Sequence, residues 1–132
     1  MSLKTSSGKK FDSKKPRAEL LPPRALLEVA SVLGFGAEKY SENNWEKLEN
    51  LESRYTGAAL RHILALMSGE KLDPETGMPH EAHAVCCLLF ILEDKIKNEE
   101  RRQEKRLREP DSVEHTESYK ITEPRERWLT NN

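Results

Sequence analysis

The chain has 132 residues, enough for one domain or for one domain with a tail. Hydrophobic residues make up 36% and charged residues 34%, and 22 Lys and Arg against 23 Asp and Glu give a net charge of −1. This balance argues against a protein that holds nucleic acid through bulk positive charge. The longest apolar run, Ala84 to Leu92, is far shorter than the roughly 20 residues of a membrane span. We therefore expect neither nucleic acid nor a membrane as a partner.

The cysteines and the N-terminal stretch indicate a cellular compartment. Residues Met1 to Lys15 are basic and polar and contain no apolar signal segment. Cys86 and Cys87 are neighbours inside the apolar run, where thiols behave as small buried hydrophobes and cannot pair with each other in a helix. These features predict a cytoplasmic protein.

The first part of the chain predicts an arm followed by a helix. Residues 1–20 are rich in Ser, Lys and Gly and are expected to form a flexible basic arm. Leu21-Pro22-Pro23 then opens a helix, because proline suits the first helical turn and blocks helix before it. Apolar residues recur at spacings of three and four up to Tyr40. Gly34 and Gly36 interrupt the pattern and predict a break or a close backbone approach.

Two further helices are expected, each preceded by a loop. Ser41 to Asn50 is polar around a single tryptophan and reads as a loop, and a second amphipathic helix follows from about Glu52 to Glu70. KLDPETGMP then forms a loop by its turn residues. Pro79 starts a third helix, which is apolar on every face from Ala84 to Leu92. Such a segment predicts burial on all sides, in a bundle or between subunits.

The rest of the chain is polar. From Glu93 to Glu109 charges of both signs recur at helical spacings, which predicts a solvated extension of the third helix that Pro110 ends. Residues 110–132 have too few apolar side chains to build a core and are expected to form a polar tail. With no internal repeat and no β-pattern, the sequence predicts an all-α domain over residues 21–109 between the arm and the tail.

The densest group of ligand-type side chains surrounds the second predicted loop. His80 and His83 lie three residues apart, so both face one side of the third helix, with roughly 5–6 Å between their Cβ atoms. Glu70, Asp73 and Glu75 precede them, and a helical hairpin brings all five residues to the same end of the bundle. Carboxylates favour Mg²⁺ or Mn²⁺, and imidazoles shift the preference toward Mn²⁺, Co²⁺ or Zn²⁺. Helix capping and turn formation are the structural alternative for these residues.

Candidate substrate-binding groups lie on the first helix and in the loop after it. Glu28 and Lys39 share a face of the first helix, roughly 16 Å apart, too far to share one ion but able to flank an elongated anion. Trp45 beside Asn44 offers a stacking ring and an amide for a nucleobase, or else a hydrophobic plug.

Basic residues and a histidine complete the candidates. Lys15 and Arg17 either clamp phosphates or belong to a solvated tail. His62 lies on the apolar stripe of the second helix, where a histidine is usually a core residue, and Arg61 points about 100° away from it.

Four motifs between Lys10 and Glu93 resemble those of a known family. They are K-F-D-x-x-K-P-R, F-G-A-x-K-Y-x-x-x-N-W, L-R-H and G-E-x-x-D-x-E-x-G-x-x-H-x-x-H, in this order. They are similar to the phage dATP/dGTP diphosphohydrolases, a MazG-like branch of the all-α nucleoside triphosphate pyrophosphohydrolases. Within it they are similar to the MazZ enzymes of phages that replace adenine with 2-aminoadenine.

The resemblance implies an enzyme of nucleotide metabolism. It implies a MazG-like helical bundle completed by homo-oligomerisation, as a dimer or tetramer, in the host cell cytoplasm. A purine (deoxy)nucleoside triphosphate, dGTP or GTP, would be hydrolysed to the monophosphate and pyrophosphate with Mg²⁺ or Mn²⁺, or with Co²⁺. MazG-like enzymes generally bind metal through E-x-x-E and E-x-x-D, whereas the third helix here has His80-x-x-His83 and the second has no E-x-x-E. Which carboxylates hold the ions stays open.

The residue types and the resemblance together give each candidate residue a role. Catalysis is assigned to three acids and metal binding to a set that overlaps with them, while the substrate would be held by basic residues, an amide and a ring. The catalytic residues are Glu28, Glu70 and Asp73; the metal ligands are Glu70, Asp73, Glu75, His80 and His83; the substrate-binding residues are Lys15, Arg17, Lys39, Asn44, Trp45, Arg61 and His62.

Three alternatives remain. The enzyme could prefer dATP, because purine identity rests on a few hydrogen bonds that the sequence does not locate. A histidine-centred metal phosphohydrolase could use His62, Asp73, His80 and His83 to remove phosphates singly or as triphosphate. A helical interaction module with the charged helix from Glu93 as its contact surface would hydrolyse no nucleotide at all.

Overall fold

The computed structural model describes residues 8–109. They fall into two units, residues 8–21 and residues 22–109, and each is described by itself. In the first unit an exposed segment ends in the short 3-10 helix η1 (Ala18–Leu20), and Arg17 forms an ion pair with Glu19 at 2.8 Å. The polar tail predicted for residues 110–132 lies outside the described residues.

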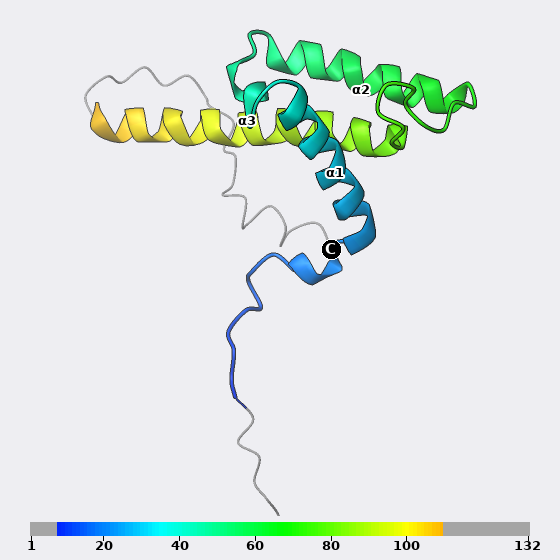
Figure 1. Ribbon diagram of the computed structural model, residues 1–132. Helices are drawn as coiled ribbons and strands as arrows, with labels where there is room; N and C mark the ends of the chain where they lie inside the picture. The colour runs from blue at the N-terminus through cyan, green and yellow to red at the C-terminus, as the bar shows by residue number, and fades with distance from the viewer. Residues whose placement is uncertain (1–7, 110–132) are drawn as a thin grey trace, which may run out of the picture. The chain divides into compact units, whose positions relative to one another are not determined.

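The second unit is helical. It contains α1 (Pro23–Lys39), the 3-10 helix η2 (Asn44–Lys47), α2 (Leu51–Met67) and α3 (His80–Arg108). α2 and α3 lie side by side and antiparallel, and α1 packs against α3 (Figure 1). Within residues 8–109 there is no strand, only one isolated antiparallel bridge in the loop between α2 and α3. The predicted all-α class is confirmed.

α1 is continuous, and the break or close approach predicted at Gly34 and Gly36 is wrong. The helix starts at Pro23 as its sequence indicates and runs unbroken to Lys39. Apart from its chain neighbours and the backbone of its own helical turns, a Cβ atom built on either glycine would meet no atom of residues 8–109 within 4 Å. Each glycine costs about 1 kcal/mol in a helix interior. The helix nevertheless forms, with Val29 and Val32 packed against α3.

α2 ends three residues before the predicted Glu70. Gly69 takes the left-handed conformation, with φ of 93°, directly after the last turn. The N–H of Glu70 donates to the carbonyl of Ala65 and that of Gly69 donates to Leu66, the two bonds of a Schellman motif. The helix therefore stops at Met67, and Glu70 begins the loop.

The core of the second unit is small and centred on α3. Val29 and Val32 of α1 contact Ala82 and Cys86 of α3, with Phe90 packed against them. Both cysteines are buried, as expected for thiols in the apolar run, and burial raises the pKa of the Cys86 thiol to about 11.

Aromatic rings extend this core to the loop before α2. The rings of Trp45 and Phe90 stack with centroids 4.9 Å apart, and Tyr55 contacts Phe90 at 5.0 Å. Lys97 lies over the Trp45 ring and pairs with Glu46 at 2.7 Å. Ser41 to Asn50 is thus not only a loop, because η2 holds Trp45 against α3.

Within one chain, Ala84 to Leu92 is buried on one side only, so its predicted burial on all faces would require a second subunit. Ala84, Cys86, Cys87 and Ile91 are buried, but the other side of the helix is open. There Leu88 and Leu92 are each 54% exposed, because one chain supplies only α1 and α2 to cover α3. None of the helices in the described part is long and apolar enough to cross a membrane.

Phe90 is expected to be a main determinant of stability, because it joins the core of α1 and α3 to Trp45 and Tyr55. Phe90→Ala should lower the free energy of unfolding by about 2–4 kcal/mol, as for large-to-small core substitutions. Leu107→Ala on the same helix is the control, since Leu107 is 82% exposed and should change stability by less than about 0.5 kcal/mol. Urea denaturation measures both, and equal effects of the two substitutions would contradict this packing.

Candidate metal centre and substrate cleft

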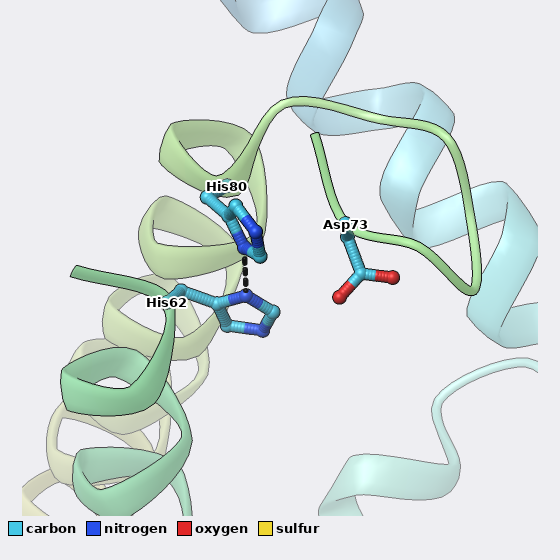
Figure 2. Close-up of side chains that lie close together, drawn as sticks. All are labelled: His62, Asp73 and His80. Carbon is cyan, nitrogen blue, oxygen red and sulfur yellow. Dashed lines mark hydrogen bonds between the residues drawn. The ribbon is translucent and has the colours of Figure 1, made fainter. Parts of the chain in front are cut away.

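Three side chains from different segments meet at one end of the α2–α3 hairpin. His62 of α2, Asp73 of the following loop and His80 of α3 each offer one ligand atom, and these atoms lie within 4.8 Å of one another. We call these three residues the His–Asp group. Figure 2 shows the two rings facing each other, with the Asp73 carboxylate beside them. The two Nδ1 atoms are 2.8 Å apart, and His80 is only 3% exposed.

The loop is built to hold Asp73 and His80 in place. Leu72 and Pro79 form the isolated bridge, and the N–H of Asp73 donates to the carbonyl of Met78 at 2.8 Å. Gly77 closes the turn with a φ of 69°, a conformation that favours glycine, and its N–H donates to the carbonyl of Asp73. Pro79 caps α3, so that His80 is its first residue.

Glu70 determines which nitrogen of His80 carries the proton. Its Oε1 lies 2.8 Å from His80 Nε2, and an ionised carboxylate can only accept a hydrogen bond. In the neutral ring Nε2–H therefore donates to Glu70, and the lone pair lies on Nδ1, facing His62. A carboxylate behind a histidine in this way is the usual arrangement around metal-binding histidines.

Asp73 is held as a carboxylate. Burial would raise its pKa, but the N–H groups of Thr76 and Glu75 donate to Oδ1 at 3.0 and 2.9 Å and lower it. The nearby His83 and His62 lower the pKa as well, and these effects together exceed the effect of burial. The pKa of Asp73 is therefore lowered.

His83 does not belong to the His–Asp group, although its ring stacks on that of His62. Its ring lies parallel to that of His62, with centroids 4.6 Å apart and 13° between the planes, and its Nε2 is 2.7 Å from Thr76 Oγ1. Burial lowers the pKa of both His62 and His83; the other histidines add to the effect, and the opposing influence of Asp73 does not cancel it. Both rings are therefore neutral at neutral pH.

A cleft of about 970 Å³ lies beside the His–Asp group, lined by the end of α1, the segment around η2, α2 and α3. Its volume is in the range of small-molecule sites, about 300–1,000 Å³. The structure brings five of the seven predicted substrate-binding residues to this cleft: Lys39, Asn44, Trp45, Arg61 and His62. The cleft is also lined by Arg54, Tyr55, Thr76 and Phe90, to which the sequence motifs assigned no role.

The other predicted residues are not part of the His–Asp group. The Glu75 carboxylate forms an ion pair with Lys39 at the cleft. Glu28 is exposed on α1 and, within residues 8–109, is not part of the cleft lining. Lys15 and Arg17 belong to the first unit, and their contact with phosphates stays a prediction.

The fold and the site define an all-α protein with a histidine–carboxylate group beside a cleft. The family model described as dATP/dGTP diphosphohydrolase, N-terminal, matches residues 5–105. The chain belongs to this family, which confirms the resemblance to the phage dATP/dGTP diphosphohydrolases.

A curated relative is the dATP/dGTP diphosphohydrolase of Salmonella phage PMBT28. It is 42% identical over 85 residues, which are 64% of this chain and 29% of the relative. The chain thus spans less than a third of the length of that relative. No solved structure matches the chain.

Stability in metal-free buffer is expected to fall with acidification. Folding lowers the pKa of His62 and His83. Below the ordinary histidine pKa of about 6.5, the unfolded chain therefore binds more protons than the folded protein does. The free energy of unfolding should therefore be smaller at about pH 5.5 than at about pH 7.5, and His62→Gln should reduce this difference. Denaturant titrations with a chelator at both pH values measure it. Equal pH dependence in wild type and variant would refute the assignment.

Proposed function

We propose that this chain carries the metal-binding and substrate-binding site of a nucleoside triphosphate diphosphohydrolase, which converts dGTP (and GTP) to the monophosphate and pyrophosphate. The observation that carries the proposal is the position of His62, which belongs both to the His–Asp group and to the cleft lining. One residue thus joins a place for a metal ion to a place for a nucleotide. The name of the phage relative supports the substrate class.

The donors of the His–Asp group fit a divalent ion. Without an ion, His62 Nδ1–H donates to His80 Nδ1 at 2.8 Å, and an ion bound by both atoms would take the place of that hydrogen, with the His62 proton moved to Nε2. Two neighbouring imidazole ligands of an octahedral ion lie about 3 Å apart when each metal–nitrogen bond is about 2.1 Å, close to the present separation. Asp73 is ionised and His62 is neutral, the forms that bind metal. Mixed nitrogen and oxygen donors suit Mn²⁺ or Co²⁺, with Mg²⁺ favoured by the carboxylate. When bound, such an ion activates water and neutralises phosphate charge.

This assignment differs from the predicted ligand set. His62 takes the place of His83, Glu70 orients His80 from behind, and Glu75 is paired with Lys39. Glu28 has no part in it.

The cleft supplies the groups that a nucleoside triphosphate requires. Lys39, Arg54 and Arg61 line it, and their charges offset those of the phosphates. We place the phosphates at the His62 end and the purine near η2, where Asn44 offers an amide. Trp45 forms the wall there, since Phe90 already covers part of its ring.

The proposal also includes a role in the metabolism of phages that replace adenine with 2-aminoadenine. That role and the preference for dGTP over dATP belong to this proposal.

A histidine-centred phosphohydrolase is the second candidate. The observation that favours it is that the metal-competent group contains His62 and His80, with His83 stacked on it. The two candidates differ in the bond that is broken and therefore in their products.

A nucleotide panel with Mg²⁺, Mn²⁺ or Co²⁺ distinguishes the candidates. We expect dGTP to give dGMP and pyrophosphate. Release of phosphate or triphosphate would favour the second candidate. No hydrolysis of any nucleotide with any of the ions would contradict both and favour an interaction module.

Substitutions within the His–Asp group should weaken metal binding and turnover together. Asp73→Asn keeps the shape of the side chain but removes its charge, and we expect it to lower Mn²⁺ affinity and kcat for dGTP by at least about 100-fold. Glu81→Gln is the matched control, because Glu81 is exposed in the first turn of α3 and should behave as wild type. Titration calorimetry and product assays measure the two effects, and normal Mn²⁺ affinity in Asp73→Asn would exclude Asp73 as a ligand.

We further propose that a second copy of the chain covers the open side of the hairpin. Four apolar residues of α2 and four of α3 recur at helical spacings and are at least 40% exposed: Leu60, Ile63, Leu64, Met67, Val85, Leu88, Leu89 and Leu92. Antiparallel pairing of two such hairpins would bury both stripes in a four-helix bundle. The mixed charges after Glu93 are self-complementary. Leu89 also lines the cleft, so this interface would border the site.

Leu88→Glu is expected to dissociate this assembly, because it places a charge in the centre of the apolar surface. Sedimentation at micromolar concentration should show wild type as a dimer or larger and the variant as a monomer of 15.2 kDa. Leu27→Glu on α1 is the control, since Leu27 is 68% exposed outside the two stripes. A wild-type monomer that hydrolyses dGTP would refute the interface.

A further inference from the structure

The hydroxyl of Thr76 has three polar neighbours. Thr76 Oγ1 lies 2.7 Å from His83 Nε2 and 3.4 Å from Asp73 Oδ1, and it accepts the N–H of Met78 at 3.2 Å. The residue is half-buried and lines the cleft. It therefore contacts both the His–Asp group and the histidine stacked on that group, yet it has no role in the function proposed above.

One arrangement of hydrogens satisfies all three contacts. A hydroxyl donates one hydrogen and accepts two. The ionised carboxylate of Asp73 can only accept, and the backbone N–H of Met78 can only donate. The Thr76 hydroxyl therefore donates to Asp73, and its remaining lone pair accepts the Nε2–H of His83. If the hydroxyl donated to His83 instead, two oxygen acceptors would face each other with no hydrogen between them.

This arrangement determines the state of the His83 ring. With its proton on Nε2, a neutral imidazole has its lone pair on Nδ1. Stacking on His62 holds the plane of the ring, and the bond to Thr76 fixes its rotation within that plane.

We propose that Thr76 is a positioning residue of this site. Its hydroxyl accepts the Nε2–H of His83 and donates to Asp73, and it thereby holds His83 in one tautomer with Nδ1 free to accept a proton or a ligand. The hydrogen bonds are independent of the reaction. The inference rests on the proposed function only where that function makes Asp73 a metal ligand and makes the cleft that His83 lines a nucleotide site.

Nitrogen NMR of the histidine side chains in metal-free buffer reads the tautomer directly. We expect His83, assigned by the signal lost in His83→Gln, to be mainly the Nε2–H form in wild type. Thr76→Val keeps the shape of the side chain and removes the hydroxyl, so His83 should populate both tautomers. Thr76→Ser should restore the wild-type signal. Thr56→Val is the control, because Thr56 is exposed on α2, and it should change nothing.

Turnover of dGTP provides a second readout. Thr76→Val should lower kcat by about 10–100-fold with a smaller change in KM, and Thr76→Ser should recover most of the loss. An Nδ1–H tautomer in wild type, or an unchanged tautomer in Thr76→Val, would overturn the positioning role even if dGTP is hydrolysed. If the tautomer responds as expected but no nucleotide is hydrolysed, the proposed function fails and the positioning role stands.

Discussion

The contact between His62 and His80 is the interaction on which the site depends, because it joins α2 to α3 where the hairpin turns. His80 is 3% exposed, and a buried imidazole must find partners for both nitrogens. It finds them in His62 and Glu70, and no buried side-chain nitrogen or oxygen among the described residues lacks a hydrogen-bond partner. Glu70 is available because the Schellman motif ends α2 at Met67. A longer α2 would carry Glu70 onto the helix and away from this pairing.

The α2–α3 loop positions Asp73, as the helices position the histidines. Backbone N–H groups hold its carboxylate ionised, and the Thr76 hydroxyl links it to His83. A site whose carboxylate is ionised and whose imidazoles are neutral and oriented needs little rearrangement to receive a cation, apart from the shift of the His62 proton from Nδ1 to Nε2. Beside the His–Asp group, the end of α1, the segment around η2, α2 and α3 line a cleft that reaches His62. The metal-competent group and the cleft thus share one residue, and this is the physical basis for the proposed reaction.

Much of the fold could be predicted from local patterns. Proline at the first turn indicated the start of α1, apolar spacing indicated α1 and α2, and the turn residues of KLDPETGMP indicated the loop. Pro79 and the apolar run after it indicated α3. The sequence predicted the end of α2 three residues too late, because the helical spacing of three and four continued to Glu70. Gly69, a residue typical of helix C-termini, indicated the correct end. The partner of His80 could not be predicted, since periodicity puts His83 on the same helix face but says nothing of the register that brings His62 across from α2. The role of Thr76 could not be predicted, because threonine is common in turns and its spatial neighbours are known only from the structure.

The position of a bound ion tests the central claim most directly. Crystals grown with Mn²⁺ and measured at an absorbing wavelength locate the metal by its anomalous scattering, independently of turnover. The account predicts a peak bound by His62, Asp73 and His80, with Glu70 hydrogen-bonded to His80 from behind. A peak held instead by carboxylates such as Glu28 and Glu70, with the three histidines free of metal, would contradict it.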